Sequence, residues 1–325
     1  MLQGLQGRGL LIHHWDTDGI CSARLILKHL KNKEITNKTP VIGNYFLTEE
    51  EISKYSVKYD YIIIVDMSLP EENILRLAQH AKIFIFDHHL GKEIKNVFHH
   101  NPIIKGENPD KYPSASWIVN DFLGNSLNLY SILGVLGDHE QKIKNNKKIF
   151  KKITDFCNEN NISFKELLKM VYLLDTNYKT GDKKAVEEAP KILLKFNSPD
   201  DILNHKKWNE NHNKINQEIE SILSSQNKEI NGIIYKKINT PFNIISAITR
   251  QISWNTRKNT LVINTGFFKD KDQIYMRSIK DAAPMIKRGK ELGLKCGGKK
   301  EVLGAIVPKE KTKIFIEEII NFLKQ

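Results

Sequence analysis

The stretch from Ile83 to His89 reads Ile-Phe-Ile-Phe-Asp-His-His, an apolar run that ends in one acid and two imidazoles. Alternating β-branched and aromatic residues favour a largely buried β-strand. A charged aspartate at the end of such a strand is costly to bury without a cation or hydrogen-bond donors. Because ligands of open α/β sheets bind at the carboxyl ends of the strands, this stretch predicts both a sheet and a site.

Two earlier apolar runs also end in polar groups. Residues 8–14 read Arg-Gly-Leu-Leu-Ile-His-His, and residues 61–66 read Tyr-Ile-Ile-Ile-Val-Asp. Segments with helical character lie between the runs, at residues 20–30 and 70–81. A further strand is expected at residues 41–46. This alternation of strands and helices predicts an α/β fold with a doubly wound, mostly parallel sheet.

The chain has 325 residues, which is too long for one average domain, so two domains of unequal size are expected. Helices are predicted between residues 115 and 196. A polar helix over residues 205–226 carries apolar residues on one stripe and is predicted to be solvent-exposed and to link the domains. A second, smaller α/β unit is expected to begin near Gly232.

The composition narrows the partners and the compartment. The chain carries 50 Lys and Arg against 38 Asp and Glu, and its net charge of +12 favours a polyanionic partner such as nucleic acid. The alternative is a lysine-rich surface that only confers solubility. No apolar run reaches about 18 residues and no signal peptide is evident, so no membrane association is expected. Three scattered cysteines without a CxxC pair suit the reducing cytosol, which predicts a cytoplasmic location.

Four clusters of acids and imidazoles occur along the chain, three after apolar strands and one after an apolar helical segment. They are His14-Trp15-Asp16-Thr17-Asp18-Gly19, Asp66, Asp87-His88-His89 and Asp138. Since strand ends converge on one edge of a parallel sheet, these groups are expected to meet there. Their mutual repulsion would be severe without cations. Mixed Asp and His ligation suits Mn²⁺ or a similar divalent ion, and Mg²⁺ if oxygen ligands dominate.

Two such ions, about 3.5–4 Å apart and bridged by a shared carboxylate, would clamp a phosphate and generate hydroxide near neutral pH. Each motif alone has a simpler explanation. Residues 16–19 suit an acidic helix N-terminus, and Asp66 suits the N-cap of the next helix. The two histidines suit a polar strand exit, and Asp138 suits a turn cap. The occurrence of all four clusters at strand or helix ends favours the metal site.

The ordered motifs resemble those of the DHH phosphoesterases, a family named for the tripeptide that is Asp87-His88-His89 in this sequence. The first family motif, His-x-Asp-x-Asp-Gly, matches residues 14–19. The second is a lone aspartate after an apolar strand, here Asp66, and the fourth is Gly followed by Asp, here Gly137-Asp138. The resemblance spans nearly the whole chain and is closest in style to the stand-alone archaeal RecJ-like exonucleases.

This resemblance implies a division of labour along the chain. Residues 1–197 would form the DHH metal-binding catalytic domain, and residues 198–228 a helical linker. Residues 229–325 would form the smaller, substrate-binding DHH-associated domain. Its substrate contacts would include a Gly-Gly-rich loop and an Arg-Ser pair, and the implied residues are Arg277, Ser278, Gly297, Gly298 and Lys299.

The resemblance also implies the roles of the residues in the catalytic domain. Two divalent ions, with Mn²⁺ preferred and Mg²⁺ as the alternative, would share Asp66 as a bridge. The first ion would be held by His14, Asp16 and Asp66, and the second by Asp18, Asp66, His88 and Asp138. His89 would contact the scissile phosphate, and Asp87 would orient a ligand imidazole.

Two rival ligands stay open. His13 rivals His14, because some relatives place the histidine further ahead of the aspartates. Asp175 rivals Asp138, because bacterial relatives have Asp-Thr at the fourth motif. Asp138 is preferred, since it lies fifty residues past His88 (138 − 88 = 50), as the resemblance leads us to expect.

The C-terminal loop departs from the family pattern, which usually reads Gly-Gly-Gly-His. Here Cys296-Gly297-Gly298-Lys299 occupies that place, so a lysine replaces the histidine. Two glycines still let backbone N–H groups approach a phosphate, and Lys299 adds a charge-assisted contact. The alternative is a simple glycine turn. Four aromatic residues could stack on bases or belong to the core: Trp254, Phe267, Phe268 and Tyr275.

The residues predict metal-dependent hydrolysis of phosphodiesters. The resemblance implies a single-strand exonuclease that acts on DNA or RNA and releases 5′-mononucleotides, and some relatives bind replication or repair proteins such as a helicase. One alternative is a phosphodiesterase for short oligonucleotides or cyclic dinucleotides. Another is a non-catalytic replisome subunit that kept the fold and lost the metals, against which the intact acids and imidazoles argue.

Overall fold

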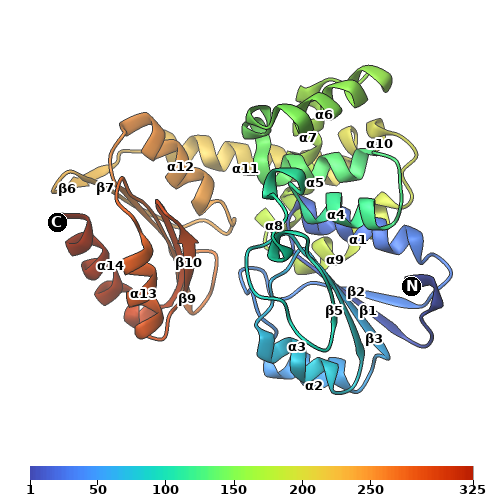
Figure 1. The fold of residues 1–325 in the computed structure, drawn as a ribbon. Helices are drawn as coiled ribbons and strands as arrows, with labels where there is room; N and C mark the ends of the chain where they lie inside the picture. Colours follow the sequence, from blue (N-terminus) through green and yellow to red (C-terminus); the bar gives the residue numbers. More distant parts are fainter. Residues whose placement is uncertain (325) are drawn as a thin grey trace. The chain divides into compact units, whose positions relative to one another are not determined.

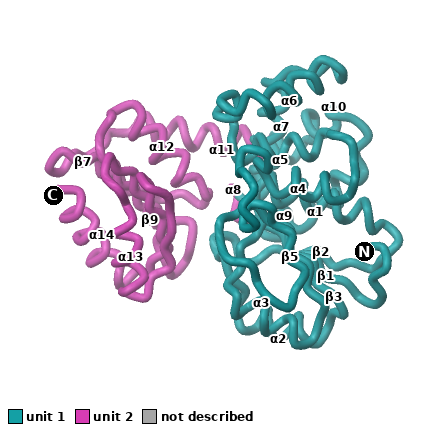
Figure 2. The backbone as a smooth tube through the Cα atoms, viewed as in Figure 1, with its two compact units in different colours: residues 1–178, 182–209 teal, residues 179–181, 210–325 magenta. Residues whose placement is uncertain are grey.

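The computed structural model describes residues 1–324, which divide into two compact units. The first unit contains residues 1–178 and 182–209, and the second contains residues 179–181 and the chain from residue 210 onward (Figure 2). Within residues 1–324, no helix combines the length and the apolar character that crossing a bilayer requires. The functional division into catalytic domain, linker and substrate-binding domain stays a prediction.

The first unit is built on a five-stranded sheet whose strands all run parallel. The strands are β1 Gly9–His13, β2 Ile35–Lys38, β3 Tyr61–Val65, β4 Lys82–Phe86 and β5 Phe98–His100. Their order in the sheet is β2-β1-β3-β4-β5, so the direction of winding reverses between β1 and β3. The predicted class, an α/β fold with a doubly wound parallel sheet, is confirmed for this unit. At such a reversal the loops diverge and leave a crevice at the carboxyl ends of the strands.

Helices cover both faces of this sheet, with α2 and α3 on one side and α1 and α4 on the other (Figure 1). This explains why β1 and β3 are apolar at successive positions, since every residue of both strands is buried. The helices of the first unit are α1 Thr17–His29, α2 Glu49–Ser56, α3 Glu71–Ala78, α4 Ala115–Phe122, α5 Leu129–His139, α6 Lys147–Glu159, α7 Phe164–Leu174, α9 Lys183–Leu193 and α10 Pro199–Leu203. Short 3₁₀ turns are η1 Leu2–Gly4, η2 Ile103–Lys105, η3 Pro109–Lys111 and η4 Glu140–Asn145, and α8 Thr176–Lys179 spans the unit boundary.

The prediction of a strand at residues 41–46 is wrong. That segment is a loop, and the second strand is the preceding Ile35–Lys38. This strand reads Ile-Thr-Asn-Lys, lies at the edge of the sheet and is mostly half-buried. Its backbone pairs with β1, but most of its side chains are polar and so give no pattern typical of a strand. The neighbouring segment is more apolar, and the strand was therefore predicted there.

The second unit contains a six-stranded sheet in the order β10-β11-β9-β8-β7-β6, in which only the β7–β8 pair is parallel. The strands are β6 Lys228–Ile230, β7 Ile233–Ile238, β8 Thr260–Asn264, β9 Lys271–Arg277, β10 Lys295–Lys299 and β11 Val302–Pro308. The helices are α11 Lys206–Ser224, α12 Ile245–Thr256, α13 Ala283–Glu291 and α14 Lys309–Lys324, and α11 begins in the first unit. The expected smaller α/β unit is therefore present.

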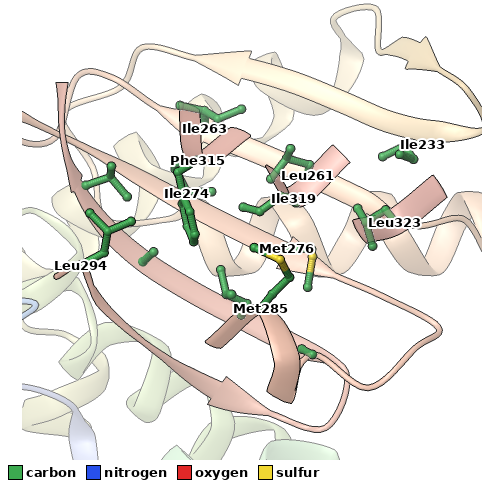
Figure 3. Packing of buried hydrophobic residues seen from close by; sticks show 14 residues of the cluster. Ile233, Leu261, Ile263, Ile274, Met276, Met285, Leu294, Phe315, Ile319 and Leu323 are labelled. Atoms are coloured by element: carbon green, nitrogen blue, oxygen red, sulfur yellow. The ribbon is translucent and has the colours of Figure 1, made fainter. Parts of the chain in front are cut away.

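Both faces of this second sheet are buried. Leu261 and Ile263 of β8 pack with α13 and α14, in a cluster that includes Met285 and Phe315 (Figure 3). Val262, between them on the strand, packs in a second cluster with α12 and α11. Residues 205–226 were predicted to form a solvent-exposed helix, and a helix, α11, is present there. One of its faces is not exposed, because its apolar stripe packs in this second cluster.

Candidate metal centre

Three strands of the first unit end side by side and are followed by acids and imidazoles. β1 leads into residues 14–18, β3 into Asp66 and β4 into residues 87–89. Because β3 lies between β1 and β4, Asp66 is central to the arrangement. The carboxyl end of α5 adds Asp138. Three groups that could each hold a cation result, and within each group the ligand atoms lie within 4.8 Å of one another.

The first group consists of His14, Asp16 and Asp66. Asp16 is the N-cap of α1, and one of its carboxylate oxygens accepts a hydrogen bond from Gly19 N at 3.1 Å. Its other oxygen lies 2.7 Å from His14 Nδ1, which in turn lies 3.7 Å from Asp66 Oδ2. The simpler explanation of Asp16 as a helix cap is therefore correct, but capping uses one oxygen and leaves the other facing the cluster.

Asp66 has the backbone geometry and the electrostatics expected of a functional residue. Its φ of 56° places it in the left-handed region, which is sparsely populated by residues other than glycine. It is not the N-cap of α3, which is Pro70. Burial raises the pKa of Asp66 well above its usual value, and the charges of Asp18, Asp16, Asp138 and Asp87 raise it further. An ionised Asp66 is thus costly in this place unless a cation neutralises it.

Another of the three groups consists of Asp18, His88 and Asp138. Asp18 is fully buried, and its two oxygens accept hydrogen bonds from the amides of Ala115 and Ser116 at 2.7 and 3.0 Å, at the N-terminus of α4. His88 Nε2 lies 3.3 Å from Asp138 Oδ2 and 3.5 Å from Asp66 Oδ1. His88 therefore lies between Asp66 of the first group and Asp138 at the end of α5.

Asp87 contacts the other histidine of the tripeptide. Its Oδ1 accepts a hydrogen bond from His89 Nδ1 at 2.7 Å, so the imidazole that Asp87 contacts is that of His89. That Asp87 orients a ligand imidazole stays a prediction. Burial opposes ionisation of Asp87, but the contact with His89 outweighs it and lowers the pKa of the carboxyl. Burial also opposes the charge on His89, yet Asp87 and the surrounding aspartates raise the pKa of this imidazole. His89 is the group that completes the remaining cluster, with Asp66 and His88.

The two rival ligands lie outside these groups. His13 is fully buried, its Nδ1 donates to the carbonyl of His14 at 2.6 Å, and its Nε2 lies 3.0 Å from the Asn37 side-chain amide. Burial lowers the pKa of His13 to about 4. Asp175 accepts a hydrogen bond from the Thr17 hydroxyl at 2.7 Å, and none of the three groups includes it.

The chemistry of the donor set fits divalent cations. His14 Nε2 and Asp66 Oδ2 are buried and have no hydrogen-bond partner among residues 1–324. Buried polar atoms are nearly always satisfied in folded proteins, so the unpaired Asp66 Oδ2, within a cluster of carboxylates and imidazoles, suits ligation of a cation. Carboxylate oxygens with imidazole nitrogens are a donor set typical of Mn²⁺ and related ions.

The residues predicted to bind substrate in the second unit gather at one end of its sheet. Gly297 and Gly298 were predicted to form a loop, but they belong to the edge strand β10, which pairs with β11. Glycine has no side chain, so two glycines give no apolar pattern that would predict a strand. The strand forms here because its backbone pairs with β11. Val302 pairs with Lys299 on one side and Arg277 on the other, so these three side chains share one face. Ser278 follows directly and is buried.

The aromatic candidates for base stacking differ in exposure. Trp254 is 57% exposed, and the guanidinium groups of Arg250 and Arg277 lie 5.4 and 5.9 Å from its ring. Tyr275 instead packs against an apolar cluster, and Phe267 and Phe268 contact each other edge to face at 4.7 Å. Trp254 is the one of the four whose ring is largely open to solvent.

Gly134 of α5 is a positioning residue that sequence reasoning missed. A Cβ at this position would overlap the Ser116 hydroxyl and Asp18 Oδ1, so only glycine lets α5 approach this pair. The available signal was an isolated glycine inside an apolar helix, which often marks a packing requirement. The amides of Ala115 and Ser116 carry no signal in the sequence, because any residue except proline supplies an N–H group.

Replacing Gly134 by alanine is expected to lower the free energy of unfolding by about 1–3 kcal/mol, because the added methyl group overpacks the site. Alanine is intrinsically the better helix former by about 1 kcal/mol, so a loss would isolate the steric effect. Denaturant unfolding of the metal-free protein measures it. Gly137→Ala, on the same helix, is the control: its Cβ would lie 3.1 Å from Thr17 Cβ, and a smaller loss is expected. A Gly134→Ala protein as stable as the wild type would contradict the close approach.

Part of the first unit matches a known protein family. Residues 10–158 match the family model described as DHH family, N-terminal domain. No curated protein matches this chain at a significant level. Among solved structures, exonuclease RecJ bound to manganese is similar with a TM-score of 0.69 and 13% identity, over 98% of this chain and 90% of that one.

Two further structures share the fold. The DHH domain of a protein described as a member of a family of ribosomal proteins gives a TM-score of 0.71 and 15% identity, over 98% of this chain and 87% of that one. RecJ from Thermus thermophilus in complex with Mn²⁺ gives 0.70 and 13%, over 97% of this chain and 52% of that one. This chain thus spans about half the length of the Thermus protein. At these identities the likeness shows a common fold.

Proposed function

We propose that this chain, whose residues 10–158 match the DHH family model, is a metal-dependent phosphodiesterase that removes 5′-mononucleotides from single-stranded nucleic acid. The observation that carries the proposal is the buried cluster around Asp66. Three potential cation sites meet there, and two of its buried polar atoms have no hydrogen-bond partner within residues 1–324. The net charge of +12 supports a polyanionic substrate. We place the activity in the cytoplasm, in keeping with the three cysteines that form no CxxC pair.

In this proposal two divalent cations, with Mn²⁺ preferred, occupy the cluster. The first would be held by His14, Asp16 and Asp66, and the second by Asp18, Asp66, His88 and Asp138. When bound, such ions neutralise the carboxylates, acidify a water and stabilise the negative charge that develops on the phosphate. The pairing of Asp18 with the N-terminus of α4 fixes one carboxylate in advance, so binding does not have to order it.

His89 acts on the substrate phosphate. Its Nδ1–H is held by Asp87, and the raised pKa of the imidazole favours the protonated form. A protonated His89 can donate Nε2–H to a non-bridging phosphate oxygen and so stabilise the transition state. Asp87 is itself held in place by burial, and Asn101, also buried, donates a hydrogen bond to the carbonyl of His89 at 2.8 Å. Asp87 is therefore a positioning residue for His89.

In the second unit, Arg277, Ser278, Gly297, Gly298 and Lys299 are proposed to bind the substrate. The shared face of Arg277 and Lys299 supports this role, because two cations on one face suit a phosphate backbone. Trp254 beside Arg277 supplies a ring on which a base could stack. A replication or repair protein such as a helicase is the class of protein partner that we propose.

The test is a length series of end-labelled single strands, from a dinucleotide to a thirty-nucleotide strand, incubated with Mn²⁺ and with EDTA. We expect Mn²⁺-dependent release of 5′-mononucleotides from strands of every length. Hydrolysis confined to the shortest substrates would replace the exonuclease with a short-oligonucleotide enzyme. Tight strand binding without any hydrolysis in Mn²⁺ would instead identify a non-catalytic protein.

A further inference from the structure

A cleft of about 840 Å³ opens beside the metal centre, within the first unit. One wall is formed by η3 and the start of α4, and the other by η4 and the start of α6. Its lining residues include His88 of the metal cluster, so the cleft and the cluster are continuous. The side chains on which the argument depends are Trp117, Lys142, Lys147, Lys148 and Lys152. We call this feature the lysine cleft.

The charge of the lysine cleft is strongly unbalanced. Five lysines and one aspartate, Asp110, line it. Lys111 lies 3.2 Å from a carboxylate oxygen of Glu107. The other four lysines are exposed and have no carboxylate within 4.0 Å among the residues that the structure describes; they are Lys142, Lys147, Lys148 and Lys152. Four unneutralised cations around one cleft repel one another and favour a polyanionic occupant.

Two of these lysines stand where the helix itself disfavours them. Lys147 and Lys148 begin α6, whose first turn contains no acidic residue. The N-terminus of a helix carries partial positive charge, so cations there cost stability and anions gain it. Lysines in the first turn of a thirteen-residue helix are thus unfavourable for the isolated fold, and a bound anion would reverse that effect.

The cleft also offers an aromatic surface and fixed walls. Trp117 is half-buried on the α4 side, and Lys152 from α6 lies 5.3 Å from the centre of its ring. The Asn146 side chain donates to the carbonyl of Asp110 at 2.7 Å, and His139 Nε2 lies 2.8 Å from the carbonyl of Pro113. These hydrogen bonds join the two walls, so the cleft exists before any ligand arrives.

We propose that the lysine cleft binds the phosphate backbone of a single strand on the side of the scissile bond that remains attached to the enzyme. This inference rests on the proposed function and assigns a strand-holding role to residues outside the metal centre. Flexible ammonium groups bind successive phosphates as point charges, and Trp117 gives a base a ring to stack on. The single-strand class follows from this combination of cations and an aromatic ring in a cleft that is continuous with His88.

The test variant replaces the four lysines together by glutamine: Lys142→Gln, Lys147→Gln, Lys148→Gln and Lys152→Gln. Fluorescence anisotropy with a labelled twenty-nucleotide strand in EDTA measures binding without hydrolysis. We expect the Kd to rise at least tenfold. The slope of log K against log salt should fall by up to about 2.8, because each phosphate contact on a single strand contributes about 0.7. With Mn²⁺, kcat/KM should fall much more for the long strand than for a dinucleotide.

A matched variant removes the same number of charges nearby without touching the lysine cleft. It carries Lys144→Gln, Lys151→Gln, Lys165→Gln and Lys169→Gln, and all four of these lysines are exposed on or beside α6 and α7. We expect at most a twofold change in Kd for this control. Equal weakening by both variants would reduce the effect to net charge and overturn the proposal. Unchanged binding by the test variant, or an equal loss on dinucleotide and long strand, would overturn it as well.

The proposed function and the strand-holding role of the lysine cleft can fail separately. If the wild-type protein hydrolyses no substrate in Mn²⁺, the proposed function fails, but the metal-free binding assay still tests the lysine cleft. If hydrolysis proceeds as expected and the test variant binds the long strand like the wild type, only the lysine cleft fails.

Discussion

Asp66→Asn is expected to lower kcat by about a thousandfold or more, because it removes the carboxylate that two of the three potential cation groups share. Asparagine keeps the size of the side chain and tolerates the left-handed backbone at this position, where alanine would add conformational strain. The loss should therefore come from the charge and leave the fold intact. Single-turnover hydrolysis of a short strand in Mn²⁺ measures it, and circular dichroism checks the fold.

Asp175→Asn provides the matched control for Asp66→Asn. Asp175 contacts Thr17 near the cluster but belongs to none of the three potential cation groups. Its amide variant can still accept the Thr17 hydrogen bond, so we expect activity within a few-fold of the wild type. A thousandfold loss in Asp175→Asn would transfer the ligand role from Asp138 to its rival. Wild-type activity in Asp66→Asn would remove the shared-ligand argument altogether.

The second large effect concerns stability. An ion at a free concentration one hundred times its Kd stabilises the folded protein by about 2.7 kcal/mol if it does not bind the unfolded chain. We therefore expect Mn²⁺ to raise the unfolding midpoint of the wild type markedly, and to raise that of Asp66→Asn much less. Denaturant unfolding in Mn²⁺ and in EDTA gives both values. A wild-type midpoint that is independent of Mn²⁺ would contradict a cation site in the cluster.

The metal-free protein should also show a distinctive pH dependence. The pKa of Asp66 in the folded protein lies well above its value of about 4 in the unfolded chain. Below about pH 4, the carboxyl is protonated in both states and does not affect the free energy of unfolding. As the pH rises above about 4, the unfolded chain releases this proton while the folded protein retains it, and stability is lost until the folded pKa is passed. In EDTA, Asp66→Asn should thus become more stable than the wild type as the pH rises. A constant difference between the two proteins across this range would contradict the raised pKa.

Much of the first unit could be predicted because its strands are buried on both faces. The apolar runs at residues 8–14, 61–66 and 83–89 coincide with β1, β3 and nearly all of β4. The acids that follow these strands converge because the strands are parallel neighbours. The second strand was misplaced because an edge strand such as Ile35–Lys38 is held by backbone pairing that leaves no apolar pattern. β10 was missed for the same reason, since its two glycines carry no side chains.

The site could be predicted at the level of which residues meet, but their pairwise contacts could not. The spacing of Asp87 and the two histidines is equally compatible with a contact to either imidazole. In the structure, the side-chain rotamers place Asp87 against His89. The binding of Asp18 by the amides at the start of α4 depends on where that helix begins in space. Gly134 is required by the same packing, which links segments far apart in the sequence.

The dispersed origin of the cluster has a consequence for how the protein matures. Its groups come from four separate stretches of the chain, and the last of them, Asp138, lies at the end of α5. Long-range contacts of this kind form late, after loop closure has been accomplished. A nascent chain that ends before α5 can offer only part of the donor set, so ion capture should accompany the last steps of folding. The rate at which refolding protein takes up Mn²⁺ would then report completion of this unit, not its initial collapse.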